Sequence, residues 1–274
     1  MYENIKVIVA DIDNTLKPTK LDIPQKRVID TIEKLRSKGY LFGLASGRPY
    51  DDVEDKYKEW GMEKQFDFIV GWNGCQLYDD STKQLHKYNY LKKEDIKEII
   101  EFMEPYDTVV SMYEPEVYLC NKENERAWFS AWKNHRSFEC VSTYERFYKE
   151  DNGGIMFRTT VELMPEIEEA VSKQTVGKDY IGFKTQADLM EFSHKDSNKG
   201  FAFKKYCELH NISLDDCMAF GDTSNDNEML KCCHGICLLN GSDDTKVCAE
   251  RITETDCQNE GFADFIEKYI LRGE

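Results

Sequence analysis

Two carboxylates with a single residue between them follow an apolar run near the start of the chain. Asp11 and Asp13 lie in "KVIVADIDNTLKPT", which covers residues 6–19. Side chains alternate between the faces of a strand, but the backbone leaves the sheet at the carboxyl end, so both carboxylates can turn into one crevice. Taken alone, the motif is also compatible with a simple acidic turn in which Asn14 and Thr15 supply turn and capping chemistry. The other polar motifs of the chain must decide between these interpretations.

Three further polar motifs follow in the sequence, and each falls where a strand or a strand–helix loop is expected to end. They are "SGR" at residues 46–48, "NKG" at 198–200 and "GDTSND" at 221–226. Alone, Lys199 reads as a solvated helix residue, and Thr223 or Ser224 as a helix cap. In an open α/β sheet, however, the carboxyl ends of the strands line one crevice. The joint occurrence of the four motifs therefore favours a single site.

The elements that would position these motifs follow an α/β pattern at both ends of the chain. "IKVIVADI", "YLFGLAS" and "FDFIVGW" read as strands, with a helix from about Asp22 to Gly39 and another over "YDDVEDKYKEW". From Ser197 the pattern resumes with the helix "SNKGFAFKKYCELH" and the strand "CMAFGD". This alternation predicts an α/β fold with a Rossmann-like, doubly wound parallel sheet.

The middle of the chain has a different pattern, with hairpin-like strand pairs and separate helices. It predicts an α+β domain inserted at residues 83–193 into a discontinuous core formed by residues 1–82 and 194–274. Within it, "NERAWFSAWKNHR" is expected to be a helix. Trp128 and Trp132 are four residues apart on one face of that helix, and we expect at least one of them to lie in the domain core.

Bulk properties exclude several classes of function. The 274 residues carry a net charge of −16, which opposes binding to nucleic acid or to anionic membranes. No apolar run approaches the roughly 20 residues of a membrane helix, and the first residues carry no secretion signal. We therefore expect a cytoplasmic protein without a membrane or nucleic-acid partner. A small phosphorylated metabolite stays compatible with the charge, because a local cation or amide cradle can override the long-range field.

The ten cysteines are spread over a long chain and lie in apolar segments, which favours reduced thiols over a disulfide framework. The densest group is "KCCHGIC", residues 231–237. A zinc site is the weaker interpretation here, since adjacent cysteines point apart and no second ligand pair follows.

With these four motifs the sequence resembles the haloacid dehalogenase-like phosphatases, in particular the Cof-type subfamily with a C2-type (C2B) cap. The resemblance covers nearly the whole chain and rests on DxDxT, a hydroxyl residue followed by GR, the lysine of "NKG" and GDxxND, in the order usual for the family. Three positions depart from the pattern. Asn14 replaces the usual glycine, Ser46 the usual threonine, and Trp72 an asparagine that often precedes "NG".

The resemblance implies an aspartyl-phosphate mechanism. Asp11 would attack phosphorus, and Asp13 would protonate the leaving group and then take a proton from the attacking water. Ser46 and Lys199 would complete the catalytic set and stabilise the charge of the transferring group. The residues implied to bind substrate are Gly47, Arg48, Asn73 and Asn225.

The resemblance also implies a cofactor, Mg²⁺, which prefers hard oxygen ligands and would relieve the repulsion between two carboxylates and a phosphate. Its ligands would be the Asp11 carboxylate, the Asp13 backbone carbonyl and Asp222. Asp226 would stand behind them and orient Lys199 or a metal-bound water.

The expected function is Mg²⁺-dependent hydrolysis of a small phosphomonoester, such as a sugar phosphate or a phosphorylated cofactor. The inserted domain would act as a lid that reads the leaving group, with Arg126 and Arg136 as candidate contacts. A hexose phosphomutase is the alternative enzyme, since the same site could return the phosphoryl group to the substrate. A phosphoryl-receiving signalling module is a third hypothesis, which the large insertion and the position of the DxD on the first strand oppose.

Overall fold

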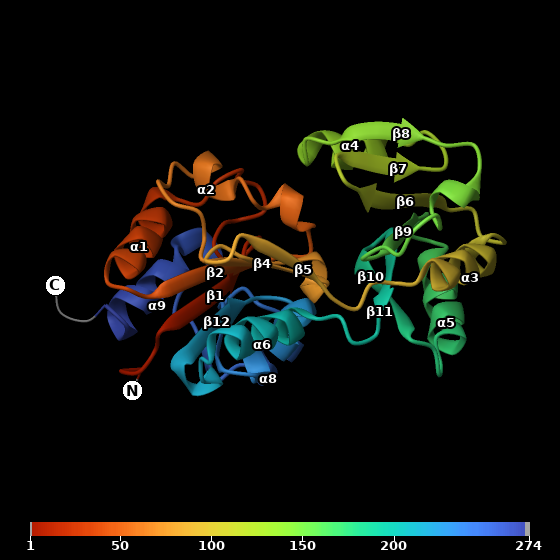
Figure 1. Ribbon diagram of the computed structural model, residues 1–274. Helices are drawn as coiled ribbons and strands as arrows, with labels where there is room; N and C mark the ends of the chain where they lie inside the picture. Colours follow the sequence, from red (N-terminus) through yellow and green to blue (C-terminus); the bar gives the residue numbers. More distant parts are fainter. Residues whose placement is uncertain (1, 272–274) are drawn as a thin grey trace. The chain divides into compact units, whose positions relative to one another are not determined.

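The chain folds into two compact units, which Figure 1 shows in a computed structural model that describes residues 2–271. The first unit combines residues 1–88 with 198–274, and the second is formed by residues 89–197. Within the described residues, no helix combines the length and the apolar character needed to cross a membrane.

The first unit is built on an eight-stranded sheet with the order β14-β13-β12-β1-β2-β3-β4-β5. The strands from β14 to β3 run parallel, and β4 and β5 are antiparallel to their neighbours. Their bounds are β1 (Val7–Asp11), β2 (Leu41–Ala45), β3 (Phe68–Gly71), β4 (Gln76–Asp79), β5 (Gln84–Lys87), β12 (Cys217–Gly221), β13 (His234–Cys237) and β14 (Arg251–Ile252).

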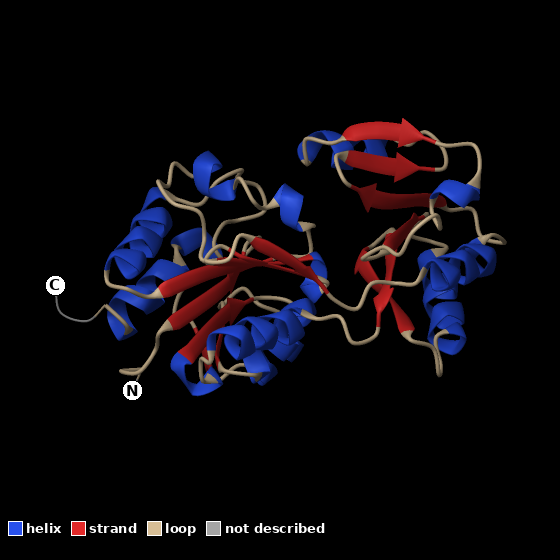
Figure 2. Ribbon diagram, in the orientation of Figure 1, coloured by secondary structure: helices blue, strands red, loops and turns tan. Residues whose placement is uncertain are grey.

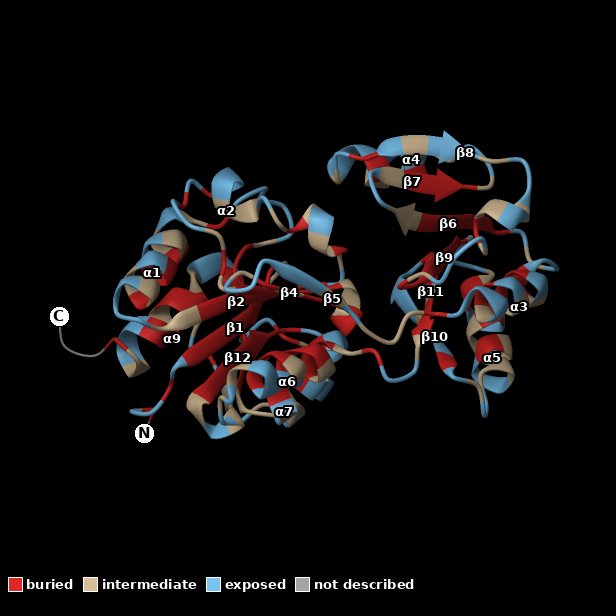
Figure 3. Cartoon of the chain, viewed as in Figure 1, coloured by how far each residue is buried: buried red, intermediate tan, exposed pale blue. Residues whose placement is uncertain are grey.

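Helices cover both faces of this sheet, because the central strand alternates apolar side chains between two cores. Ile8 and Ala10 of β1 pack with α1 (Lys26–Ser37) and α9 (Gly261–Tyr269). Val7 and Val9 pack with α6 (Lys199–His210) and α7 (Asn227–Lys231) on the other side. This unit also contains the short helices α2 (Lys56–Glu59) and α8 (Asp243–Cys248). Figure 2 shows this layering and Figure 3 the buried central strands. The predicted doubly wound α/β core is confirmed.

The helix expected over "YDDVEDKYKEW" differs from the prediction. A 3₁₀ turn at Tyr50–Asp52 is followed by the single-turn helix α2, and the two do not join. In the segment from Tyr50 to Trp60 only two apolar residues, Val53 and Trp60, are buried. Little apolar surface therefore holds a continuous helix against the sheet.

The second unit contains a six-stranded sheet with the order β10-β11-β9-β6-β7-β8. One face packs against α3 (Lys93–Met103) and α5 (Met164–Gln174), and the other against α4 (Glu125–Lys133). The strands are β6 (Val109–Glu114), β7 (Val117–Cys120), β8 (Ser137–Cys140), β9 (Ile155–Arg158), β10 (Tyr180–Gln186) and β11 (Leu189–His194).

The expectation that Trp128 or Trp132 lies in the core of this unit is wrong. Their exposed fractions are 55% and 61%, and their rings lie parallel on the outer side of α4. Ala127 and Ala131 are the buried residues of this helix. Small side chains at these two positions let the helix lie close to the sheet, so the indoles project from its outer side.

The boundaries of the second unit also lie a few residues from the expected 83 and 193. Strand β5 pairs with β4 in the large sheet, so the chain leaves the first unit after Tyr88. At the other end, Ser197 still donates a hydrogen bond to the carbonyl of Asn89, and α6 begins two residues later.

Candidate active site

Three neighbouring strands of the large sheet deliver polar residues to one edge. Asp11 is the last residue of β1 and stands opposite Ala45, the last residue of β2, in the parallel ladder. Ser46 follows directly. On the other side of β1, strand β12 ends at Gly221 and is followed by Asp222. The topology therefore brings the motifs at 11–15, 46–48 and 221–226 to the same edge.

Lys199 joins this edge from the first turn of α6. Its side chain is fully buried, and its Nζ lies 2.5 Å from Oδ1 of Asp11 and 2.6 Å from Oδ1 of Asp226. Asn198 caps the helix by accepting a hydrogen bond from the backbone N–H of Phe201, which fixes where the helix begins. A buried ammonium needs paired anions, so Lys199 ties β1 to the loop after β12.

Asp226 is engaged at both carboxylate oxygens. Oδ1 accepts from Lys199, and Oδ2 accepts from the backbone N–H groups of Asp222 at 3.0 Å and Thr223 at 3.2 Å. Together with the side chain of Thr223, these contacts close a capping box at the start of the following turn. Asp226 therefore holds the loop in shape and orients Lys199.

Asp222 lies beside this pair, and the hydroxyl of Thr15 donates to its Oδ1 at 3.1 Å. Carboxylate oxygens of Asp11, Asp222 and Asp226 all lie within 4.8 Å of one another. The burial of Asp222 and the charge of Asp226 raise the pKa of Asp222 to about 7. Burial likewise raises the pKa of Asp11, against the lowering effect of Lys199, and the charges of Asp226 and Asp222 add to the rise.

These three carboxylates face one ammonium, so the cluster carries excess negative charge. The pKa of Lys199 is raised: burial alone would lower it, but Asp11 and Asp226 together outweigh burial. Since Lys199 and two backbone amides already satisfy Asp226, the oxygens suited to a cation are those of Asp11 and Asp222. Hard oxygen donors with surplus negative charge fit a divalent ion such as Mg²⁺.

The side chain of Asp13 is held by two cations of its own. Its Oδ1 lies 2.6 Å from Nζ of Lys17 and its Oδ2 2.6 Å from a terminal nitrogen of Arg48. Lys17 was not among the predicted site residues. The signal in the sequence is slight, because a lysine four residues after an aspartate outside a helix normally points to solvent.

Asn14 occupies a left-handed backbone conformation with φ 61°. Glycine adopts this conformation most readily, and asparagine is among the few other residues that tolerate it. The Oδ1 of Asn14 also accepts from the backbone N–H and the hydroxyl of Thr19. The departure from the usual glycine therefore leaves the turn intact.

The loop after β3 packs against two of the motif loops. The backbone N–H of Asn73 donates to the carbonyl of Ser46 at 3.0 Å, and that of Trp72 donates to the carbonyl of Arg48 at 2.7 Å. The Oδ1 of Asn73 accepts from the amide of Asn225 at 3.2 Å. A side chain at Gly47 would approach Asn73, so the predicted substrate-binding residues Gly47, Arg48, Asn73 and Asn225 lie on contacting loops.

This loop is held in an uncommon conformation. Trp72, Asn73 and Gly74 all have positive φ, at 49°, 50° and 95°. A side chain at Gly74 would collide with the backbone of Asn198, the residue that caps α6. The loop therefore lies directly against the start of the helix that carries Lys199. A bulky residue such as Trp72 at positive φ costs on the order of 1–3 kcal/mol, and such strain concentrates at functional sites.

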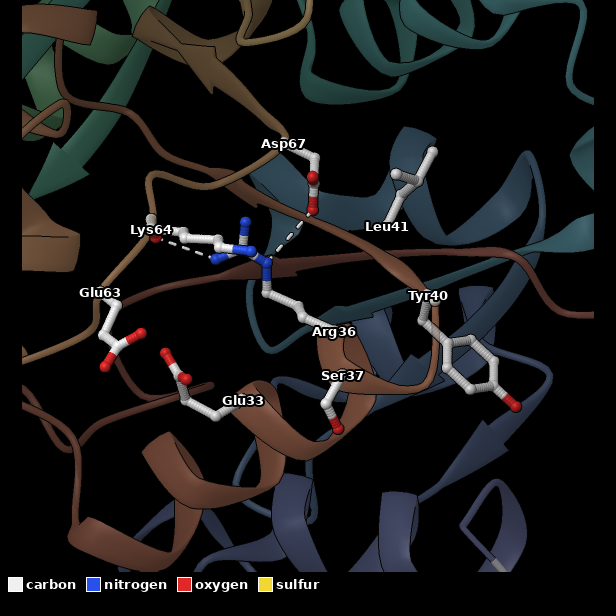
Figure 4. A pocket seen from close by; sticks show the side chains of 9 residues that line it. Glu33, Arg36, Ser37, Tyr40, Leu41, Glu63, Lys64 and Asp67 are labelled. Carbon is white, nitrogen blue, oxygen red and sulfur yellow. Dashed lines mark hydrogen bonds and ion pairs between the residues drawn. The ribbon is translucent and has the colours of Figure 1, made fainter.

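Two hollows lie away from this edge. The first, of about 320 Å³, is at the amino ends of β2 and β3 and is shown in Figure 4. Its Arg36 donates to the backbone carbonyls of Lys64 and Gln65 and pairs with Asp67, so it fastens the loop before β3. The second, of about 650 Å³, is in the second unit, where Arg126 and Arg158 both pair with Asp188.

The cysteine-rich segment at 231–237 forms no site of comparable kind. Among the described residues, Asp11, Asp222 and Asp226 form the only cluster of acidic, histidine or cysteine side chains whose ligand atoms lie close enough together to hold a metal ion. The Nδ1 of His234 pairs with Glu250 at 2.6 Å, and Cys237 is a buried residue of β13.

Comparison with known proteins gives matches along most of the chain. The family model described as haloacid dehalogenase-like hydrolase matches residues 8–266. The 5-amino-6-(5-phospho-D-ribitylamino)uracil phosphatase of Bacillus subtilis is 25% identical over 273 residues, which cover 96% of this chain and 97% of that protein.

Solved structures agree in fold. A haloacid dehalogenase-like hydrolase from Bacteroides thetaiotaomicron superposes with a TM-score of 0.85 at 21% identity, covering 96% of this chain and 99% of that one. A sugar phosphatase of haloacid dehalogenase subclass IIB superposes with a TM-score of 0.80 at 18% identity, covering 96% and 98%.

Proposed function

The chain belongs to the haloacid dehalogenase-like hydrolases, and on that premise we propose that it hydrolyses a small phosphomonoester through a phosphoryl group carried transiently on Asp11. A sugar phosphate or a phosphorylated cofactor is the substrate class. The observation that carries the proposal is the buried cluster of Asp11, Lys199 and Asp222 at the carboxyl ends of β1 and β12. In this cluster the carboxylate proposed as the nucleophile lies 2.5 Å from a buried ammonium, which supports the proposal because phosphoryl transfer depends on positive charge near the transferring group.

In the first step, an oxygen of Asp11 forms a bond to phosphorus while the bond from phosphorus to the leaving oxygen breaks. Asp13 gives its proton to that oxygen, so the product leaves as an alcohol. In the second step, water attacks the phosphorus of the aspartyl phosphate, Asp13 takes a proton from the water, and Asp11 is released as a carboxylate. Inorganic phosphate and the starting enzyme result.

The groups around Asp11 would stabilise the charge on the transferring oxygens. Lys199 supplies a point charge that its two aspartates hold in place, and it needs no rearrangement before the reaction. The hydroxyl of Ser46, the backbone N–H of Gly47 and the amide of Asn225 are the proposed neutral donors. Arg48 is the proposed mobile cation, since its side chain is partly exposed and reaches Asp13 from a separate loop.

Mg²⁺ would be held by the carboxylates of Asp11 and Asp222 and the backbone carbonyl of Asp13. When bound, it supplies positive charge between the carboxylates and the phosphate dianion. The surplus of negative charge in this cluster is the observation that supports it.

We assign the second unit, residues 89–197, the role of a cap that meets the leaving group. The feature that supports this role is the outer side of α4, where Trp128, Phe129 and Trp132 are each more than half exposed. Arg136 is a packing residue instead, because it is buried, donates to the carbonyl of Glu114 and lies over the ring of Tyr113.

The direct test is a screen of phosphate release with Mg²⁺ over sugar phosphates, nucleotides, flavin and pyridoxal phosphates. We expect release from at least one of these substrates, none in excess chelator, and recovery when Mg²⁺ is added back. Analysis of the organic product distinguishes the mutase alternative, which would return an isomeric hexose phosphate in place of the free sugar. Undiminished turnover in chelator would remove the metal from the proposal.

A further inference from the structure

Lys17 is an unusual residue for the position it occupies, because its side chain is almost fully buried. Its exposed fraction is 4%. The Nζ donates to Oδ1 of Asp13 at 2.6 Å and to the carbonyl of Leu21 at 2.9 Å. Burying an ammonium is costly unless it is paired and hydrogen-bonded. The two contacts meet that requirement, and they aim the charge at the side chain of Asp13.

The backbone of the same turn fixes Lys17 relative to Asp13. The backbone carbonyl of Lys17 accepts a hydrogen bond from the backbone N–H of Asn14 at 2.6 Å. The backbone N–H of Lys17 donates to the carbonyl of Ile12 at 3.1 Å. Residues 12–17 therefore form a closed turn that fixes the backbone of the lysine relative to that of the aspartate. With the ammonium also held by the carbonyl of Leu21, few other positions are open to the side chain.

The second cation on Asp13 is held differently. Arg48 comes from the loop after β2, its side chain is 20% exposed, and it contacts Oδ2, the other carboxylate oxygen. Each carboxylate oxygen of Asp13 is therefore paired with one cation. Lys17, on Oδ1, is enclosed within the same turn, whereas Arg48, on Oδ2, lies on a different loop and is partly exposed. A phosphate dianion entering the site competes for Arg48 more readily than for Lys17, because guanidinium groups bind phosphate and this one is accessible.

We propose that Lys17 is a positioning residue that holds Asp13 through Oδ1 during turnover, so that Oδ2, vacated by Arg48, is the oxygen that exchanges the proton. The inference rests on the proposed function, in which Asp13 gives a proton to the leaving group and later takes one from water. The proposed effect of Lys17 on the reaction passes through Asp13 alone. It is distinct from the residues that the family motifs single out, since it follows the DxDxT segment.

The test compares Lys17→Met, which keeps most of the unbranched side chain but removes the charge, with the wild type on two aryl phosphates. Phenyl phosphate has a poor leaving group and p-nitrophenyl phosphate a good one. We expect kcat for phenyl phosphate to fall about 10- to 100-fold, a part of the roughly 10²- to 10⁴-fold due to general acid–base catalysis. The loss on p-nitrophenyl phosphate and the change in KM should both be smaller.

A double-mutant cycle separates positioning from a general structural effect. In an Asp13→Asn background, Lys17→Met should cost no more than about 2-fold in kcat, because the group through which it acts is already gone. Lys173→Met is the matched control: Lys173 also follows its acidic partner, Glu169, by four residues, but is 72% exposed and lies in the second unit. It should leave both rates unchanged.

Equal losses on the two substrates, full additivity with Asp13→Asn, or no loss at all would overturn the assignment. If Lys17→Met does not fold, Lys17→Gln, which keeps a hydrogen-bond donor, takes its place in the same cycle. Failure of both variants to fold would make Lys17 a structural residue. The proposed function is tested separately by Asp11→Asn: loss of turnover in that variant together with additivity at Lys17 overturns only the positioning role.

Discussion

At the scale of single residues, the site depends on an uneven distribution of charge. Lys199 is shared by Asp11 and Asp226, whereas Asp13 has its own cations in Lys17 and Arg48. The two carboxylates of the DxD motif therefore stand in different surroundings although only one residue separates them. In the proposed mechanism the two acids have different roles, Asp11 in attack on phosphorus and Asp13 in proton transfer.

Replacement of Asp13 tests the second of these roles. Asp13→Asn keeps the size of the side chain and the backbone carbonyl but removes the proton-transfer group. We expect kcat to fall by about 10²- to 10⁴-fold on alkyl phosphates and less on p-nitrophenyl phosphate, whose leaving group needs little protonation. Steady-state kinetics on both substrates measure the difference, and equal losses would contradict the role.

Replacement of Asp222 tests the metal ligand. Mg²⁺ should raise the melting temperature of the wild-type protein, because a ligand that binds only the folded state stabilises it. The increase should disappear in Asp222→Asn and persist in Asp215→Asn, a control on the loop before β12. Thermal unfolding with and without Mg²⁺ measures it, and an equal increase in wild type and Asp222→Asn would exclude Asp222 as a ligand.

At the scale of elements, α6 connects the site to the antiparallel edge of the large sheet. Its first residue is Lys199 and its last is His210. The Nε2 of His210 lies 2.9 Å from Oδ2 of Asp79, at the end of β4. Oδ1 of Asp79 accepts from the backbone N–H and the hydroxyl of Ser81. Burial alone would raise the pKa of Asp79, but these contacts outweigh it and leave the pKa below its ordinary value of 3.8.

This shift predicts a pH-dependent contribution to stability. Since the pKa is lower in the folded state, the stabilisation is present above about pH 4 and is lost as the pH falls through the folded-state value. Asp79→Asn should therefore destabilise the protein at neutral pH by about 1–3 kcal/mol, the cost of disrupting a buried hydrogen-bonded group. The difference in unfolding free energy between this variant and the wild type should narrow in acid. Urea unfolding at pH 7 and pH 3 measures both values, and a constant gap would contradict the linkage.

Helix α4 carries the prediction for substrate choice. Trp132→Ala should lower kcat/KM for the best substrate of the screen while changing hydrolysis of p-nitrophenyl phosphate little, because small aryl phosphates offer the cap few contacts. Val176→Ala, another highly exposed apolar residue of the second unit, is the control. Parallel kinetics on the two substrates test the prediction, and equal effects on both would remove α4 from the specificity surface.

At the scale of the whole molecule, the sequence was enough to predict the doubly wound sheet and the motifs that gather at its edge. Both depend on local signals: apolar runs that form buried strands and polar residues at their carboxyl ends. The inward turn of Lys17, the outward indoles of α4 and the exact limits of the second unit depend on packing between residues distant in sequence. Spacing along one helix does not tell which face it buries, and here Ala127 and Ala131 fill that face.

The central claim is that Asp11 carries the phosphoryl group. The most direct measurement is rapid quenching of the Asp13→Asn variant after mixing with p-nitrophenyl phosphate and Mg²⁺, followed by mass spectrometry of the peptide that contains residue 11. In this variant the second step lacks its proton acceptor and should slow more than the first, so the covalent form accumulates. We expect one phosphoryl group on Asp11 together with a matching burst of p-nitrophenol, and neither signal in Asp11→Asn. Near-normal turnover by Asp11→Asn, or a phosphoryl group on another residue, would contradict the account.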